Sequence, residues 1–216
     1  MTNKICVFLI SCQKHKKQWP KFIKNFQENF SFNDFFIVYA DPNLPTEFHI
    51  FGKFIVLKAN DFYEGLPEKI LKLFHLAASN EAFSEYTHFV KMDDTLNVMH
   101  NISFKKLEIS IKSDYEGSHV NDCLLPLDRK YHYDKCSSPS FNIPYTGDVT
   151  PYCNGDLYIL SRKAAESITK CKHDDIYDEI YEDLMIGKIL RLDDIIPIKN
   201  DYIFFAVDKS LVYSLI

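Results

Sequence analysis

Apolar residues in the first half of the chain occur in short runs that alternate with stretches of helical spacing. Apolar positions recur about every three to four residues over 15–30, with Pro20 near the start, and again from Leu66 to about 83. Strands that alternate with helices indicate a mostly parallel sheet in an α/β domain. The apolar runs with the length of buried strands are 5–10, 35–40, 54–57 and 89–92.

The second half begins with a long stretch, 113–156, in which no period holds and Gly, Pro, Ser, Asp, Asn and Tyr dominate. A stretch of this length is typical of a functional loop region or a disordered one, and its aromatic residues favour an ordered, binding-type loop. A strand is predicted at 156–160, and Ser161 is a suitable N-cap for the helix that follows. There is no internal repeat and no linker, so we expect one domain over 1–216.

Composition and charge exclude several classes of protein. The chain has 216 residues and a formal net charge of −5, which argues against nucleic acid as the main partner. No window reaches the roughly 18 apolar residues of a membrane span. The first residues form too short an apolar run for a signal peptide. We therefore expect a soluble, cytoplasmic protein without a membrane span.

The six cysteines contain no C-x-x-C pair, so a zinc site is not expected. Without an export signal we expect reduced thiols, although one bridge within 123–153 stays an alternative. A basic stretch, formed by Lys14, Lys16 and Lys17, follows the first predicted strand. Such a stretch is more often a solvated turn than a phosphate clamp.

Two adjacent acids, Asp93 and Asp94, come directly after the apolar run at 89–92. In open α/β sheets the ligand lies beyond the carboxyl ends of the strands, which is where these acids are expected. Carboxylates at that place hold a divalent cation or act in acid–base chemistry. Paired Asp residues also occur in ordinary turns, so the pair alone does not decide between these uses.

A second acidic stretch, 174–183, contains six Asp or Glu residues. One continuous helix would stack like charges at i and i+4, which costs stability. A loop through about Tyr181 and a helix from about Glu182 avoid most of that repulsion. This arrangement places Glu182 and Asp183 at a helix N-terminus, where the helix dipole favours carboxylates. From these residues alone, capping and catalysis both stay open.

Four segments, in order, resemble the β-1,3-galactosyltransferase, β-1,3-N-acetylglucosaminyltransferase and Fringe family, over about residues 5–192. Two further segments show a weaker similarity. Residues 129–131 (RKY) are similar to an R-K-W element of the family, and residues 17–19 (KQW) are similar to its R-x-T-W element. The four segments are 61–69 (DFYEGLPEK) against D-x-Y-x-N-L-x-x-K, 89–98 (FVKMDDTLNV) against K-x-D-D-D-V-F-V, 151–161 (PYCNGDLYILS) against P-Y-x-x-G-x-x-Y-V-L-S, and 182–187 (EDLMIG) against E-D-V-x-V-G.

The resemblance implies a GT-A fold, with a Rossmann-like nucleotide half (1–98) and an acceptor half (99–216). It implies transfer of a sugar, with inversion, from a nucleoside diphosphate sugar, UDP-sugar favoured, to a hydroxyl of a glycan or glycoprotein. It also implies a Mn²⁺ or Mg²⁺ cofactor and Asp183 as the general base. The implied residues for nucleotide-sugar binding are Ser11, Lys69, Lys91, Asp93, Asp94, Gly155 and Asp156, and those for the metal are Asp93, Asp94 and Thr95.

One departure from the family pattern concerns the metal. The third acid of the family's motif is Thr95 here, and a hydroxyl is a poorer ligand than a carboxylate for a hard cation. Our interpretation is that Asp94 takes over as the ligand; weak metal binding and a degenerate relative are the alternatives. The family's usual membrane anchor is missing as well, which fits a viral or bacterial relative or a domain of a longer chain.

Three other functions stay open at this point. They are a retaining transferase of the same fold, a non-catalytic module that binds nucleotide sugars or glycans, and a metal-dependent hydrolase of nucleotide sugars. Release of nucleoside diphosphate separates the enzymes from the binding module. Dependence of that release on an acceptor separates the transferase from the hydrolase.

Overall fold

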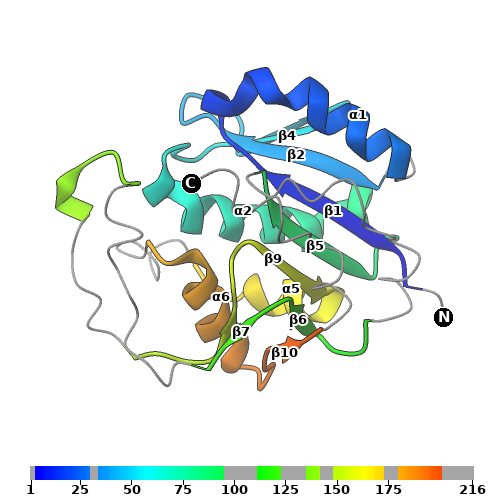
Figure 1. Ribbon diagram of the computed structural model, residues 1–216, viewed down its shortest axis with the longest axis vertical. Helices are drawn as coiled ribbons and strands as arrows, with labels where there is room; N and C mark the ends of the chain where they lie inside the picture. Colours follow the sequence, from blue (N-terminus) through cyan, green and yellow to red (C-terminus); the bar gives the residue numbers. More distant parts are fainter. Residues whose placement is uncertain are drawn as a thin grey trace, which may run out of the picture.

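The computed structural model describes residues 3–29, 34–94, 111–122, 135–141, 148–172 and 180–200. Within these residues the main sheet has eight strands in the order β10-β6-β9-β5-β1-β2-β4-β3, and β7 pairs with β8 in a separate ribbon (Figure 1). The strands are β1 Ile5–Ile10, β2 Phe35–Ala40, β3 Phe48–Phe51, β4 Phe54–Leu57, β5 His88–Asp93, β6 Tyr115–Gly117, β7 Val120–Asn121, β8 Tyr152–Cys153, β9 Leu157–Ser161 and β10 Ile198–Lys199.

Four α-helices and several short 3₁₀ turns accompany the sheet in the described part of the chain. The α-helices are α1 Trp19–Asn29, α2 Leu66–Ser79, α5 Arg162–Ile168 and α6 Glu182–Arg191. The 3₁₀ turns are η1 Gln13–Gln18, η2 Tyr63–Gly65, η3 Glu81–Phe83 and η5 Pro139–Phe141.

The centre of the sheet is parallel, as the alternation of strands and helices predicts. β1 lies between β2 and β5 and is parallel to both, and β4 is parallel to β2. β9 is antiparallel to both β5 and β6. This mixed, mostly parallel sheet with flanking helices is consistent with the expected GT-A fold. The boundary between a nucleotide half and an acceptor half stays a prediction.

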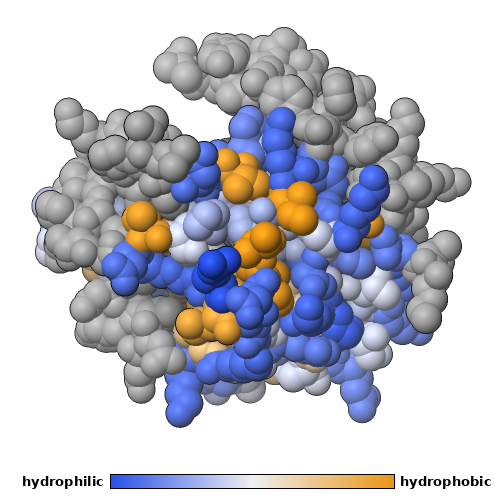
Figure 2. Space-filling model, turned by 90° about the horizontal axis from the view of Figure 1, so that it is seen from below, coloured by the Kyte–Doolittle hydropathy of each residue, from blue (hydrophilic) through white to orange (hydrophobic). Residues whose placement is uncertain are grey.

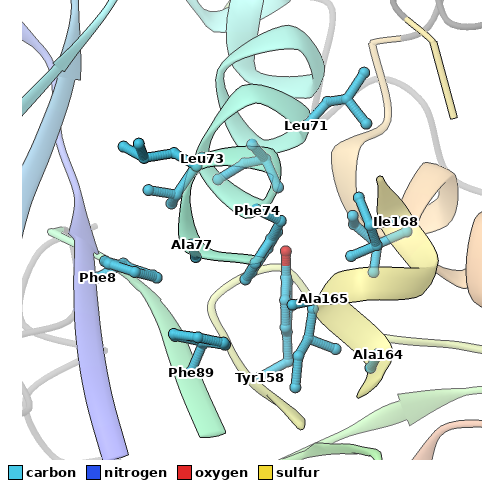
Figure 3. Packing of buried hydrophobic residues seen from close by; sticks show 14 of the residues in the cluster. Phe8, Leu71, Leu73, Phe74, Ala77, Phe89, Tyr158, Ala164, Ala165 and Ile168 are labelled. Carbon is cyan, nitrogen blue, oxygen red and sulfur yellow. The ribbon is translucent and has the colours of Figure 1, made fainter. Parts of the chain in front are cut away.

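The two faces of the sheet carry separate apolar clusters because side chains alternate along each strand. On one face, Trp19, Phe22 and Phe26 of α1 cover Val7 and Val90. The other face is covered by α2, α5 and α6. Figure 3 shows how Phe8 and Phe89 of the sheet meet Phe74 and Ala77 of α2, with Tyr158 beside Ala165 of α5.

The predicted strands in the first half are confirmed, and the helices are shorter than the sequence pattern indicates. The stretch 15–30 divides into η1 and α1, with Pro20 in the first turn of α1, where its missing N–H costs nothing. α2 ends at Ser79 because Asn80 is extended, and its side chain accepts a hydrogen bond from Ala82 N. Ser161 caps α5 as predicted, by accepting from Ala164 N.

Two strand regions are corrections to the sequence prediction. β3 forms an antiparallel hairpin with β4, turning at Gly52 with φ +53°, and its mostly exposed residues give no buried-strand signal. The stretch 113–156 contains β6, β7 and β8, which have only two or three residues each and are too short to show a period.

Several sequence predictions fall on residues outside the described ones: Thr95, the four acids at 174–179, and the aromatic residues of 123–134 and 142–147. No disulfide joins the cysteines in the described part of the chain, and Cys123 lies outside it. Among the described helices none is long and apolar enough to cross a membrane. Figure 2 shows one face, on which apolar patches lie among hydrophilic residues.

Candidate active site

The candidate site lies at the edge of the sheet where β1 and β5 end. Ile10 of β1 is in register with Asp93 of β5. Asp94 N donates to Ile10 O over 3.0 Å, and Asp93 N donates to Asp156 O over 3.0 Å. Because β9 runs antiparallel to β5, the residues that precede β9 lie beside the residues that end β5. The segment before β9 and the ends of β1 and β5 therefore meet at one place.

The side chains of Asp93 and Asp94 point to opposite faces of the sheet. The Asp93 carboxylate contacts Lys91, two residues earlier on the same face of β5. The Asp94 carboxylate contacts Ser11 and His15, on the side of the sheet that α1 covers. The two adjacent acids thus belong to two different clusters of polar side chains.

The first cluster, which we call the Lys91 cluster, comprises Lys91, Asp93, Gly155, Glu182 and Asp183. The Lys91 side chain is 0% exposed, and its Nζ lies 2.7 Å from Asp93 Oδ1 and 3.3 Å from Glu182 Oε2. Lys91 Nζ also donates to the Gly155 carbonyl. One buried ammonium therefore joins the end of β5, the segment before β9 and the start of α6.

The charges of the Lys91 cluster shift the pKa of its members. Burial alone would lower the pKa of the Lys91 ammonium, but Asp93 and Glu182 outweigh burial and raise it well above its ordinary value. Burial raises the pKa of Glu182 to about 7, against the opposing effect of Lys91. Tyr158 OH donates to Glu182 Oε1 over 2.5 Å. Glu182 is thus a buried carboxyl with partners for both oxygens.

Asp183 lies next to this buried pair but is partly exposed. Its Oδ2 accepts from Gly155 N over 3.2 Å, and its Oδ1 accepts from Leu184 N over 2.9 Å at the start of α6. Desolvation raises the pKa of Asp183 above its ordinary value, while these backbone N–H groups and Lys91 oppose the rise. Its carboxylate is therefore a stronger base than a fully hydrated Asp.

The peptide of Gly155 is enclosed by the cluster. A Cβ added at Gly155 would lie 3.3 Å from Glu182 Oε2, a tight contact, and 3.5 Å from Asp183 Oδ2, an ordinary van der Waals contact. The neighbouring Asp156 is half-buried, and desolvation raises the pKa of its carboxyl, opposed by the hydrogen bond from Leu157 N. A glycine at 155 lets both carboxylates approach the backbone.

The second cluster, which we call the His15 cluster, comprises Ser11, His15, Trp19 and Asp94. Asp94 Oδ2 accepts from Ser11 Oγ over 2.5 Å and lies 2.8 Å from His15 Nδ1. Ser11 Oγ in turn accepts from Trp19 Nε1 over 2.8 Å. These contacts tie the end of β5 to the loop, η1 and α1 that follow β1.

Asp61 and Lys69 support the same loop from the other side. Asp61 accepts from Ala40 N over 2.8 Å, from Gln13 N over 2.6 Å and from Lys69 Nζ over 2.7 Å. Lys69 Nζ also donates to Ser11 O over 3.0 Å, and its side chain is 3% exposed. The carboxyl ends of β1 and β2 are thereby held at a fixed separation.

The structure brings the predicted residues together in these two groups. Lys91, Asp93, Gly155 and Asp183 meet in the Lys91 cluster, with Asp156 beside it. Ser11 and Asp94 meet in the His15 cluster, and Lys69 contacts the Ser11 carbonyl. The candidate list drawn from the sequence omits His15, Trp19, Asp61 and Tyr158. The motifs gave a signal for three of them: 61–69 for Asp61, 151–161 for Tyr158 and, more weakly, 17–19 for Trp19; His15 had no such signal.

The described residues do not by themselves form a metal site. No group of three or more His, Cys, Asp or Glu side chains among them is arranged to hold a metal ion. Asp93 and Asp94 point to opposite faces, and each has one oxygen in a contact described above. A cation here needs further oxygen ligands, such as those of a diphosphate. Manganese dependence, and Asp94 as its ligand, stay predictions.

Comparison with known protein families gives a match over most of the chain. A family model described as galactosyltransferase matches residues 14–201, which include the Lys91 cluster, all of the His15 cluster except Ser11, and the motifs at 61–69, 89–98, 151–161 and 182–187. A search of curated proteins finds no match. The family match covers most of the chain and agrees with the mixed α/β sheet. The chain belongs to the galactosyltransferase family.

Proposed function

We propose that this glycosyltransferase moves a sugar from a UDP-sugar to a hydroxyl of a glycan acceptor, with inversion, and that Asp183 is the general base. The observation that carries the proposal is the setting of Asp183. Its carboxylate is partly exposed, oriented by two backbone N–H groups, and located where β5 ends and β9 begins. Family membership supports a nucleotide-sugar donor and a glycan acceptor.

The neighbouring acid Glu182 is less suited to the role of base. Glu182 is 4% exposed and has Lys91 and Tyr158 as partners, so a substrate hydroxyl has no access to it. Asp183 is partly exposed on the same turn of helix, and its raised pKa improves its affinity for a proton. We therefore propose that Glu182 has a structural role in the buried cluster and that Asp183 is the catalytic residue.

The proposed reaction is a single displacement at the anomeric carbon of the donor. The acceptor oxygen forms a bond to that carbon while the bond from the carbon to the diphosphate oxygen breaks. Asp183 takes the proton of the acceptor hydroxyl, so that no free alkoxide forms, and the electron pair of the broken bond leaves with UDP. Attack opposite to the leaving group inverts the configuration at the anomeric carbon.

In the proposed donor site, Lys69 and Lys91 position the carboxylates with which they form ion pairs. Lys69 contacts Asp61 and Lys91 contacts Asp93, and both ammonium groups are buried. We propose that they fix the shape of the donor site rather than reach the diphosphate. A divalent cation, if bound with the diphosphate, would neutralise charge on the leaving group. We propose Asp93 as its carboxylate ligand in place of Asp94, because Ser11 and His15 already contact the Asp94 carboxylate.

The test is an assay for nucleoside diphosphate release from UDP-, GDP- and dTDP-sugars, with Mn²⁺ or EDTA, and with or without a glycan acceptor mixture. We expect release from a UDP-sugar that depends on acceptor, and a product of inverted anomeric configuration. Release without acceptor would indicate a hydrolase. Binding without release would indicate a binding module, and retained configuration would remove Asp183 from the role of base.

A further inference from the structure

His15 connects a buried carboxylate to the surface of the candidate site. Its Nδ1 lies 2.8 Å from Asp94 Oδ2, and the side chains are 33% and 6% exposed, respectively. The backbone of His15 is fixed as well, because His15 N donates to Cys12 O over 2.9 Å. In the described part of the chain, Nδ1 is the ring nitrogen with a hydrogen-bond partner, so Nε2 is the nitrogen that a ligand can reach.

The contacts around Asp94 determine what that second nitrogen offers. An ionised carboxylate only accepts hydrogen bonds, so Asp94 fixes the proton of the neutral imidazole on Nδ1. Ser11 donates its hydroxyl proton to the same Asp94 oxygen, and Trp19 donates its N–H to Ser11. The protons of Ser11 and Trp19 are therefore used in these two hydrogen bonds and are not donated to His15. With its proton on Nδ1, the imidazole offers a lone pair on Nε2 that accepts a hydrogen bond from a hydroxyl.

The order of the strands indicates which hydroxyl is near. In the sheet, β5 lies between β9 and β1. In the proposed function, Asp183, beside the start of β9, lies at the reacting sugar. Asp93, at the end of β5, lies at the diphosphate. Because adjacent strands are about 4.8 Å apart, η1 after β1 lies roughly 10 Å from the start of β9. A donor that binds with its sugar near β9 and its diphosphate near β5 has its ribose next to η1.

We propose that His15 Nε2 accepts a hydrogen bond from a ribose hydroxyl of the donor nucleotide, and that Asp94 is the positioning residue that orients His15. This inference rests on the proposed use of a nucleoside diphosphate sugar. It makes the protein selective for ribonucleotides over deoxyribonucleotides. It also gives Asp94 a role through His15, separate from the metal.

The experiment compares the binding of UDP, 2′-deoxy-UDP and 3′-deoxy-UDP by calorimetry, with GDP and its deoxy analogues as a second series if GDP binds more tightly. The proteins are the wild type, His15→Ala, and His49→Ala as a matched control on the exposed edge strand β3. We expect the wild type to prefer UDP over one deoxy analogue by about three- to tenfold, the usual effect of one hydrogen bond. His15→Ala removes this preference by weakening UDP alone, and His49→Ala keeps it.

Three results would overturn the inference. They are an unchanged preference in His15→Ala, an equal loss for UDP and both deoxy analogues, and a loss that inorganic pyrophosphate shares, which would place the diphosphate at His15. Absence of any nucleoside diphosphate binding would overturn both this inference and the proposed function. Binding with a ribose preference that depends on His15, but without sugar transfer, would overturn the proposed function alone.

The role of Asp94 is tested by a double-mutant cycle. If Asp94 acts through His15, Asp94→Asn lowers the ribose preference in the wild-type background and changes UDP affinity little in the His15→Ala background. If Asp94→Asn instead lowers the Mn²⁺ dependence of UDP binding and leaves the ribose preference intact, Asp94 is a metal ligand and its proposed positioning role is wrong.

Discussion

Replacing Lys91 by Met should destabilise the protein, and more so at high pH. The change keeps the length of the side chain but removes the ammonium that Glu182 and Asp93 share. Removing one partner of a buried ion pair typically costs about 3–5 kcal/mol. Asp93 is one-third exposed and regains water, so Glu182, at 4% exposure, determines most of the cost. We therefore expect a loss of about 3 kcal/mol at pH of about 8.5.

The pH dependence follows from the pKa of Glu182, which burial raises to about 7 from its ordinary value of 4.5. A carboxyl whose pKa is higher in the folded state binds more protons when folded, so stability falls as pH rises between the two pKa values. Without Lys91 the pKa of Glu182 rises further, and the fall extends to higher pH. At about pH 5.5 Glu182 is mostly protonated in both proteins, and the cost of the substitution shrinks to about 1 kcal/mol.

The assay is urea unfolding of the wild type and Lys91→Met at both pH values. A loss of about 3 kcal/mol corresponds to a drop in melting temperature of about 6–12 °C for a chain of this size. Lys53→Met is the matched control, since Lys53 is buried against the rings of Phe35 and Phe36, and its loss should show little pH dependence. Adding Glu182→Gln to Lys91→Met should restore part of the stability. A cost that is equal at both pH values, with no such rescue, would refute the reasoning.

Further predictions concern the base, the metal and the helix that carries the base. Asp183→Asn should lower turnover by roughly two to four orders of magnitude, with donor affinity unchanged and at most about 1 kcal/mol of stability lost; a mutant that keeps a tenth of the turnover would exclude Asp183 as the base. Because the pKa of Asp183 is raised, the acidic limb of the pH–rate profile should lie above the ordinary range of an Asp. UDP should raise the melting temperature with Mn²⁺ and much less with EDTA, and if Asp94 is the ligand, Asp94→Asn should reduce this effect more than Thr95→Ala does. Gly187→Ala should cost about 1–3 kcal/mol in urea unfolding, because its Cβ would lie 2.7 Å from Tyr152 Cβ.

Local signals in the sequence predicted those parts of the fold that depend on neighbouring residues. The repulsion between stacked acids predicted a helix from about Glu182, and α6 begins at that residue. Ser161 was predicted to cap a helix and does so. Each of these features is decided within one helical turn, which is why the sequence alone was sufficient.

Features that depend on long-range contacts were not predictable in this way. His15 lies in a basic stretch that resembles a solvated turn, and its partner Asp94 is 79 positions away. The sequence placed Asp93 and Asp94 together as one acidic pair, whereas the fold assigns them to two clusters. The burial of Glu182 beside Asp183 also depends on Lys91, which comes from a different part of the chain.

The opposite orientation of Asp93 and Asp94 has a consequence for how this sequence can vary. Inserting or deleting one residue within β5 exchanges the faces of all the side chains that follow it. After an insertion, for example, Asp93 would take the place beside His15, and the residue before it would be directed toward Glu182. The spacing between Lys91 and the two acids is therefore constrained together with their chemical identity. Change in β5 should proceed by substitution, while changes in length are confined to the segments that join the strands.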